Sequence, residues 1–201
     1  MIAALIALKR KAPWLWHRVE DVNGLLFSVR YRRLPQLAAD VLAGVQVADY
    51  RFSLLGKEDL PALETFLKVQ PKDYLTWFAP HSFESKELYR LWRNPAFLMM
   101  KVAGADGSMA GYFFLRGFFI GRAFAGLIVD ESQQNQGIGT AIWASCADIC
   151  SRAGLTMQAT ISPDNQPSMV SCGNGTEVQP IANLDDGYLA VRCSPKKQTR
   201  Q

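Results

Sequence analysis

The stretch SQQNQGIGTAIW, residues 132–143, places Gly137 and Gly139 one residue apart, directly before a run with helical character. Glycine costs about 1 kcal/mol relative to alanine inside a helix. It is favoured where the backbone takes a positive φ or must pass close to a ligand. The stretch therefore predicts either an ordinary loop or a ligand site built from backbone groups.

The residues before this stretch favour the second interpretation. The apolar run AFAGLIVD, residues 123–130, predicts a strand, and TAIWASCADICSRAG, residues 140–154, predicts an amphipathic helix. A strand that turns through glycines into a helix aims several backbone N–H groups at one point, in front of the positive end of the helix dipole. This arrangement suits a pyrophosphate. The stretch contains neither a G-x-G-x-x-G fingerprint nor a P-loop.

The rest of the chain alternates between strand and helix patterns, without a repeat or a low-complexity tract. Together these patterns predict one mixed α/β domain over residues 46–193, followed by a flexible basic tail over 194–201. The other expected strands are 47–55, 97–104, 109–119, 155–162, 178–183 and 187–193, and the other expected helices are 56–70, 85–94 and a start near 166.

Composition and charge exclude several classes of protein. The chain is 49% hydrophobic and 20% charged, which is typical of a globular protein, and its net charge of +4 gives no argument for nucleic acid. The four cysteines form no C-x-x-C pair and lie far from either histidine, so we expect no metal site. We expect them to be buried thiols in a reducing, cytoplasmic compartment.

Residues 1–45 form a basic, tryptophan-bearing N-terminal extension whose structure the sequence leaves open. The opening apolar run of about eight residues is too short to span a membrane and lacks the charge order of a signal peptide. Asn23-Gly24 could form a hairpin turn, or the segment could be a helix that bears Leu25, Leu26 and Val29. The extension either packs on the main domain or presents a surface for weak contact with a membrane or a partner.

The glycine stretch also matches a known motif. Gln134, Gly137 and Gly139 occupy the three defined positions of [RQ]-x-x-G-x-[GA], and the stretch resembles the acyl-CoA-binding motif of the GNAT superfamily of N-acetyltransferases. Segments over residues 46–193 follow the order of that family. The resemblance implies a single, mostly antiparallel sheet with helices on both faces, and an enzyme that uses acetyl-CoA. The family more often has Arg-Gly where this chain has Gln134-Asn135, which leaves phosphate binding to backbone N–H groups and the helix dipole.

The same resemblance assigns the residues that bind the cosubstrate. In the family the fourth and fifth strands splay apart, and the pantetheine arm lies in the gap against the exposed strand edge. Asn165, in SPDNQPS after the following strand, matches an asparagine that contacts the pantetheine arm. The residues expected to bind acetyl-CoA are Ile128, Val129, Gln134, Asn135, Gln136, Gly137, Ile138, Gly139, Thr140 and Asn165.

The catalytic groups are less sharply indicated. Asp130, Glu131 and His81 are candidates for a general base, although Asp130 could instead cap a turn and His81 could bond to loop backbone. Many family members place a tyrosine as the acid in the helix after the asparagine, and this chain has none there. Ser168 is the candidate that could hold a water, with Tyr188 as a remote alternative.

The acceptor remains open between several amines. A second resemblance, to acetyltransferase-like proteins of bacterial surface-polysaccharide synthesis, rests on VEDVNGLLF, WFAPHSFE, GYFFLRGFF and TISPDNQPSMVS and implies an amino-sugar acceptor. Trp77, Phe78 and Phe83 suit stacking on a sugar and equally suit a core. A drug, a polyamine or a protein N-terminus are the other acceptors. The rival function is a non-catalytic acyl-CoA-binding or scaffold protein, and a homodimer is compatible with either function.

Overall fold

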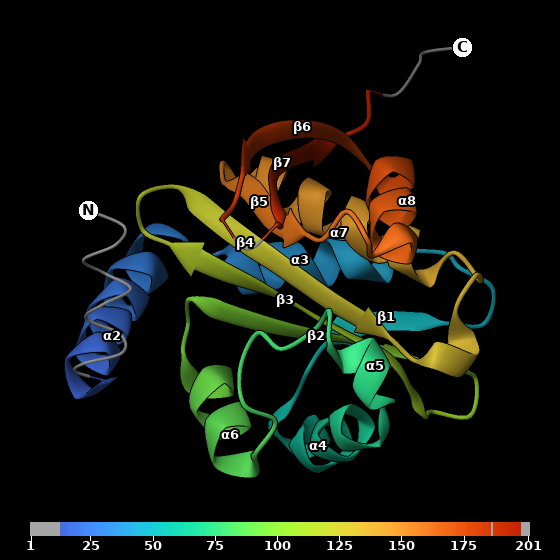
Figure 1. The fold of residues 1–201 in the computed structure, drawn as a ribbon. Helices are drawn as coiled ribbons and strands as arrows, with labels where there is room; N and C mark the ends of the chain where they lie inside the picture. The colour runs from blue at the N-terminus through green and yellow to red at the C-terminus, as the bar shows by residue number, and fades with distance from the viewer. Residues whose placement is uncertain (1–12, 186, 198–201) are drawn as a thin grey trace.

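Seven strands form one sheet in the order β1-β2-β3-β4-β5-β7-β6 (Figure 1). The computed structural model describes residues 13–185 and 187–197, so the opening apolar run, Asp186 and the last four residues lie outside the described residues. Every neighbouring pair is antiparallel except β4 with β5, which confirms the predicted mixed, mostly antiparallel sheet. The strands are β1 Arg51–Leu54, β2 Phe97–Ala103, β3 Met109–Phe118, β4 Arg122–Val129, β5 Thr156–Ile161, β6 Thr176–Asn183 and β7 Leu189–Pro195.

Helices cover both faces of the sheet, because the central strands are apolar on both sides. In Figure 1, α3 (Leu34–Ala43) and α7 (Ile138–Ala153) lie on one face of the sheet, and α4 (Leu60–Val69) and α6 (Ser85–Arg93) lie on the other. Along β3 the side chains alternate: Phe113 and Leu115 belong to the core cluster that includes residues of α3 and α7, and Tyr112 and Phe114 belong to the cluster that includes residues of α4 and α6. Two single 3₁₀ turns, Lys57–Asp59 and Glu131–Gln133, precede α4 and α7. The helices are α2 Pro13–Arg30, α3 Leu34–Ala43, α4 Leu60–Val69, α5 Lys72–Leu75, α6 Ser85–Arg93, α7 Ile138–Ala153 and α8 Gln166–Gly175.

The N-terminal extension is helical, and the hairpin interpretation of Asn23-Gly24 is wrong. Both residues lie inside α2, where they serve packing rather than a turn. The Asn23 amide donates to the Gly117 carbonyl (3.0 Å), and a Cβ at Gly117 would lie 2.2 Å from the Phe27 ring. The missing side chain at Gly117 therefore lets Phe27, only 1% exposed, pack directly on β3. A local turn signal was overridden by this tertiary contact.

An ion-pair network also holds α2 against the domain. The Glu20 carboxylate accepts from Arg116 of β3 (2.6 Å) and from Arg90 of α6 (2.9 Å). Arg116, which interrupts an apolar strand in the sequence, is therefore paired and structural. Glu87 also forms an ion pair with Arg90 (2.7 Å), so the network joins α2, β3 and α6. In the part of the chain that the structure describes, no helix is both long and apolar enough to cross a membrane.

Candidate active site

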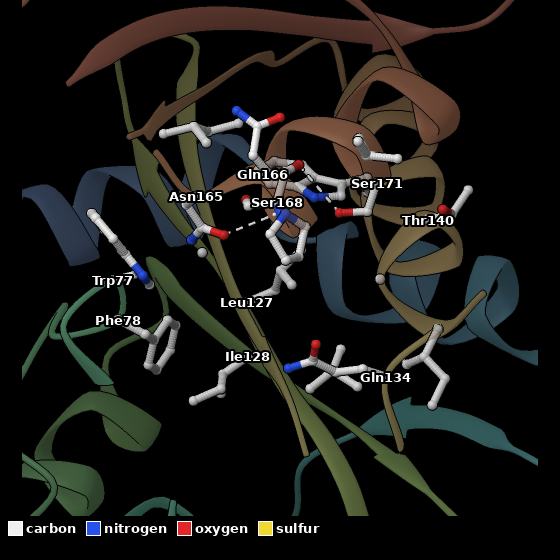
Figure 2. A pocket seen from close by; sticks show the side chains of 18 of the residues that line it. Trp77, Phe78, Leu127, Ile128, Gln134, Thr140, Asn165, Gln166, Ser168 and Ser171 are labelled. Carbon is white, nitrogen blue, oxygen red and sulfur yellow. Dashed lines mark hydrogen bonds between the residues drawn. The ribbon is translucent and has the colours of Figure 1, made fainter. Parts of the chain in front are cut away.

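The site begins where β4 and β5 stop pairing. These parallel strands are in register at only three positions, from Arg122 with Thr156 to Phe124 with Gln158. Beyond this point they diverge, as the family resemblance implied. A cavity of about 570 Å³ occupies the gap, and β4, β5, the glycine loop, α7 and α8 line it. In Figure 2, Trp77 and Phe78 lie on one side of this cavity and the α8 residues on the other.

Backbone alternation decides which groups of β4 face the gap. The Asp130 N–H donates to Ala110 on the β3 side (2.8 Å), and the Gly121 carbonyl accepts from Thr156 on the β5 side (2.9 Å). Since adjacent residues of a strand point their backbone groups in opposite directions, the odd-numbered residues of β4 face β5. The N–H and C=O groups of Ala125 and Leu127 therefore face the cavity without a strand partner.

The two residues predicted at this edge have different roles in the sheet. Ile128 turns its backbone groups toward β3, where it pairs with Tyr112, and its side chain is buried. Val129 turns its backbone toward the gap, but its carbonyl already accepts from the Tyr74 hydroxyl (2.8 Å). Tyr74 comes from α5 and also lines the cavity. Burial raises the pKa of Tyr74, so its hydroxyl stays protonated and donating at neutral pH.

The glycine loop forms the end of the cavity. Asn135 and Gly137 have φ values of 61° and 81°, and Gly137 directly precedes the first residue of α7. The first bond of this helix runs from the Ala141 N–H to the Gly137 carbonyl (3.0 Å). The N–H groups of the three intervening residues precede that bond and have no acceptor within the helix. Those residues, Ile138, Gly139 and Thr140, line the cavity.

Gly139, Gln134 and Gln136 differ in how they lie relative to the cavity. A Cβ at Gly139 would lie 3.3 Å from Ser171 Cβ, so this glycine allows α8 to approach α7 closely. Gln134 lines the cavity and is labelled beneath it in Figure 2. Gln136 is exposed and accepts a hydrogen bond from the Tyr50 hydroxyl (2.8 Å), and it does not line the cavity.

Asn165 and Ser168 lie at the start of α8, on the cavity wall. The Asn165 side-chain oxygen accepts from the Ser168 N–H (3.2 Å), which caps the helix. The Ser171 hydroxyl donates to the Ser168 carbonyl (3.2 Å), and Figure 2 shows both bonds as dashed lines. Both residues that the sequence predicted from this segment therefore reach the cavity.

Asp130 is held as a cap beside the site. Its carboxylate accepts from the Ser132 N–H and from Gln70 Nε2, each at 3.0 Å. Burial acts to raise its pKa, but the hydrogen bonds from Ser132 and Gln70 outweigh burial and hold the pKa below its usual value. The group is therefore a carboxylate at neutral pH. It lies at the end of β4 but is not among the residues that line the cavity.

His81 lies away from the cavity, in an aromatic cluster. Its Nδ1 lies 2.9 Å from the Ser82 carbonyl and its Nε2 lies 3.2 Å from the Tyr112 hydroxyl. These distances fit a neutral ring that donates from Nδ1 and accepts at Nε2. Burial lowers the pKa of His81, which keeps it neutral. The rings packed around it are those of Phe83, Phe97, Tyr112 and Phe114.

Tyr74 and Trp143 are among the residues of the cavity wall that sequence reasoning missed. Tyr74 was passed over as part of an aromatic loop, and Trp143 was interpreted only as an apolar position of α7. Trp143 is 3% exposed, and its indole N–H has no acceptor among the described residues. Its position in the second turn after the glycine loop was the signal that could have found it. Tyr188, considered only as a remote acid, also lines the cavity.

Among the residues that the structure describes, none that lines the cavity carries a charged side chain. Its polar groups are backbone amides, hydroxyls and the side-chain amides of asparagine and glutamine. An anionic ligand would therefore be held by N–H groups and the α7 dipole rather than by arginine or lysine. An ammonium group would find no carboxylate on this wall.

Comparison with known proteins identifies the family. The sequence model of the Acetyltransferase (GNAT) family matches residues 64–169, just over half of the chain. The match runs from within α4 to within α8 and covers most of the residues that line the cavity, and the chain belongs to this family of acetyltransferases. No match was found among curated protein sequences.

Solved structures with the same fold are distant in sequence. The GNAT domain of PAT from S. lividans aligns with a TM-score of 0.62 at 14% identity, over 71% of this chain and 89% of that domain. The aminoglycoside acetyltransferase AAC(6')-Ib, bound to paromomycin and acetyl-CoA, aligns at 0.59 and 15% identity, over 76% and 98%. Spermidine N-acetyltransferase from Vibrio cholerae, bound to CoA and spermine, aligns at 0.56 and 14% identity, over 73% and 94%. At these identities the alignments establish the fold.

Proposed function

We propose that this protein is an N-acetyltransferase that moves the acetyl group of acetyl-CoA to a primary amine by direct attack. The observation that carries the proposal is the gap between β4 and β5, which leads to the N-terminus of α7 through the glycine loop. The gap supplies an unpaired strand edge, and the helix supplies unpaired N–H groups. Both features suit one elongated ligand with amide groups and a pyrophosphate.

The residues divide between the two parts of that ligand. The pantetheine amides pair with the backbone of Ala125, Leu127 and Val129, beside Ile128 and Asn165. The pyrophosphate binds the backbone of the glycine loop and the first turn of α7. That second set comprises Gln134, Asn135, Gly137, Ile138, Gly139 and Thr140, which line the cavity, whereas Gln136 does not.

Positioning supplies most of the rate in this scheme. The neutral amine forms a bond to the thioester carbonyl carbon while a strand N–H stabilises the oxyanion, and the C–S bond then breaks. The amine loses one proton to a base, and the departing thiolate takes one up. Asp130 is the carboxylate nearest the end of β4 and is the candidate base, whereas His81 would need a water chain to take part.

Two hydroxyl groups are candidates for protonating the thiolate. Ser168 lines the cavity and can hold a water, although a serine hydroxyl is a weak acid. Tyr188 lines the same cavity immediately before β7, and a phenol is in general a stronger acid than an aliphatic alcohol. We expect Tyr188→Phe to lower kcat with little change in the affinity for acetyl-CoA.

The acceptor that fits this wall best is an amino sugar. Trp77 is 38% exposed beside buried Phe78, which offers an aromatic surface for a sugar ring. The uncharged wall gives no ion pair to a polycation, so a weakly basic amine with many hydroxyl groups is a better match than a polyamine. The known ligands of AAC(6')-Ib and of the Vibrio cholerae enzyme belong to those proteins and serve here as comparison substrates.

The first experiment titrates acetyl-CoA into the purified protein by calorimetry. Micromolar binding supports the proposed site, and free CoA as a comparison tests the part that the acetyl group plays. The second measures release of free thiol with a panel containing an amino-sugar nucleotide, an aminoglycoside, spermidine and a peptide. Release that depends on an amine supports the enzyme, and no binding at millimolar acetyl-CoA would refute the whole proposal.

A second candidate is a non-catalytic protein that binds acyl-CoA. It is favoured by one observation, the absence of a tyrosine from α8, where the sequence has Ser168 and Ser171. Binding of acetyl-CoA without thiol release from any amine in the panel would select this candidate. Turnover with one amine would exclude it.

A further inference from the structure

The outward side of α2 carries large apolar side chains that stand clear of the domain. Val22, Leu25 and Val29 are 57%, 67% and 72% exposed. Their i, i+3, i+7 spacing places them in one stripe. The opposite side of the same helix carries Gly24 and Phe27, which are buried against the domain. Because α2 already uses its inner side for folding, the outer stripe has no role in the packing described here.

The tip of the β3–β4 hairpin extends this stripe. Phe119 and Ile120 are 43% and 59% exposed. The hairpin is fixed to α2, because the Arg30 guanidinium donates to the Phe119 carbonyl (2.8 Å) and the Phe119 N–H donates to Asn23 (3.1 Å). The stripe and the hairpin tip form one surface, which we call the α2 face. Its residues are Val19, Val22, Leu25, Leu26, Val29, Phe119 and Ile120.

Positive charge surrounds this surface. Arg18, Arg30, Arg32 and Arg33 are exposed, and none forms an ion pair with a residue in the described ranges. The acidic residues of α2 are few: Glu20 is bound by two arginines, which leaves Asp21 as the exposed carboxylate of this helix. The sequence adds Lys9, Arg10 and Lys11 immediately before α2.

A small cavity adjoins the C-terminal end of the helix. It has a volume of about 160 Å³ and is lined by Arg30, Arg32, Arg33 and Tyr31, together with residues of α3 and α7. Three arginines at one small cavity match the phosphate of a lipid headgroup, because guanidinium groups bind phosphate oxygens through paired N–H donors.

We propose that the α2 face is a docking surface for a membrane that contains anionic phospholipid. An apolar stripe flanked by arginines inserts at the boundary of headgroups and acyl chains, and the guanidinium groups bind lipid phosphates. Folded partners with a neutral apolar surface would leave these arginines unpaired. The surface lies at the opposite end of β4 from the glycine loop, roughly 24 Å away along the strand (Figure 1). The proposal is therefore independent of the proposed acetyl transfer.

The test is co-sedimentation of the full chain with large vesicles of phosphatidylcholine, alone or with 30 mol% phosphatidylglycerol. We expect binding to the anionic vesicles, weakened at 0.5 M salt because surface charges are then screened. Arg32→Gln with Arg33→Gln should weaken partitioning about 30-fold at low salt, from the value of each arginine near an anionic surface. Leu25→Glu with Val29→Glu should abolish binding.

The matched control places the same two glutamates elsewhere on the protein. Val69 in α4 and Ile181 in β6 are 68% and 47% exposed, so Val69→Glu with Ile181→Glu makes the same change of charge away from the α2 face. This control should bind vesicles like the wild type. All variants should keep the thermal stability and the acetyl-CoA affinity of the wild type, which shows that they are folded.

Three results would overturn the proposal. The first is absence of binding to anionic vesicles by the intact chain. The second is equal binding to both types of vesicle. The third is a wild-type protein that light scattering shows to be a dimer and that binds no vesicles, together with a monomeric Leu25→Glu, Val29→Glu variant. The α2 face would then be an interface between two copies of the chain.

Discussion

Replacing Gly137 by glutamate tests the anion site with the fewest side effects. A Cβ at this position would meet only Val47 Cγ1, at 4.0 Å, so the added side chain has room. Its φ of 81° makes any side chain strained by about 1–2 kcal/mol, which lowers Tm by a few degrees for a chain of this size. A carboxylate about 6 Å from a pyrophosphate, at an effective dielectric of about 40, repels each of its two charges by roughly 1.4 kcal/mol. We therefore expect acetyl-CoA to bind about 100-fold more weakly.

Gly137→Gln separates this charge effect from bulk and strain. Glutamine has the size of glutamate and the same backbone cost, so the two variants should unfold at similar temperatures while only Gly137→Glu loses most of its affinity. Calorimetric titration at 50 mM and 500 mM salt measures both affinities, and the gap between the variants should narrow at high salt. Equal and undiminished affinity in Gly137→Glu would refute the assignment of the pyrophosphate to this loop.

Three further changes test contacts in the core and beside the site. Phe27→Ala should lower the free energy of unfolding by about 3–5 kcal/mol, because it opens a cavity against Gly117, and denaturant titration showing less than 1 kcal/mol would refute that packing. Tyr74→Phe leaves the Val129 carbonyl without its donor and should cost about 1 kcal/mol in the same assay; an unchanged midpoint would mean that the bond contributes nothing. Because burial lowers the pKa of His81 in the folded state, the unfolded chain binds the extra proton first as the pH falls below 6.5. The free energy of unfolding should therefore fall as the pH is lowered from 7 toward the pKa of His81 in the folded state. Its dependence on pH should be weaker in His81→Gln, and an identical dependence in the two proteins would contradict this.

The sheet and its helices were predictable because their signals are local. Strands such as β3 are mostly apolar, and helices such as α4 and α7 have clear amphipathic spacing. The glycine loop was also predictable, since a left-handed Gly137 before a helix needs glycine. What the sequence could not decide was α2, because Asn23-Gly24 is a turn signal until Gly117, 93 residues away, is known to lie beneath Phe27.

The sequence predicted the backbone elements of the candidate site but not the side chains that reach it from distant segments. The direction of each strand residue depends on register, so the sequence placed Ile128 at the exposed edge, whereas the Asp130–Ala110 bond turns its backbone toward β3. Side chains that reach the cavity from distant segments carry no local signal. Tyr74 and Tyr188 both line the cavity although 114 residues separate them in the sequence, and no spacing rule joins them.

One strand pair connects the cavity with the proposed docking surface. The β3–β4 hairpin presents Phe119 and Ile120 at one end, and the unpaired edge of β4 lies toward the other. Because eight register pairs hold β4 to β3 along its whole length, contact at the hairpin should not widen the gap to β5. We therefore expect anionic vesicles to leave the affinity for acetyl-CoA unchanged. If vesicles instead altered that affinity, α2 and the β4–β5 gap would have to be coupled through the core beneath α3 and α7, where Phe27 and Val129 belong to the same cluster.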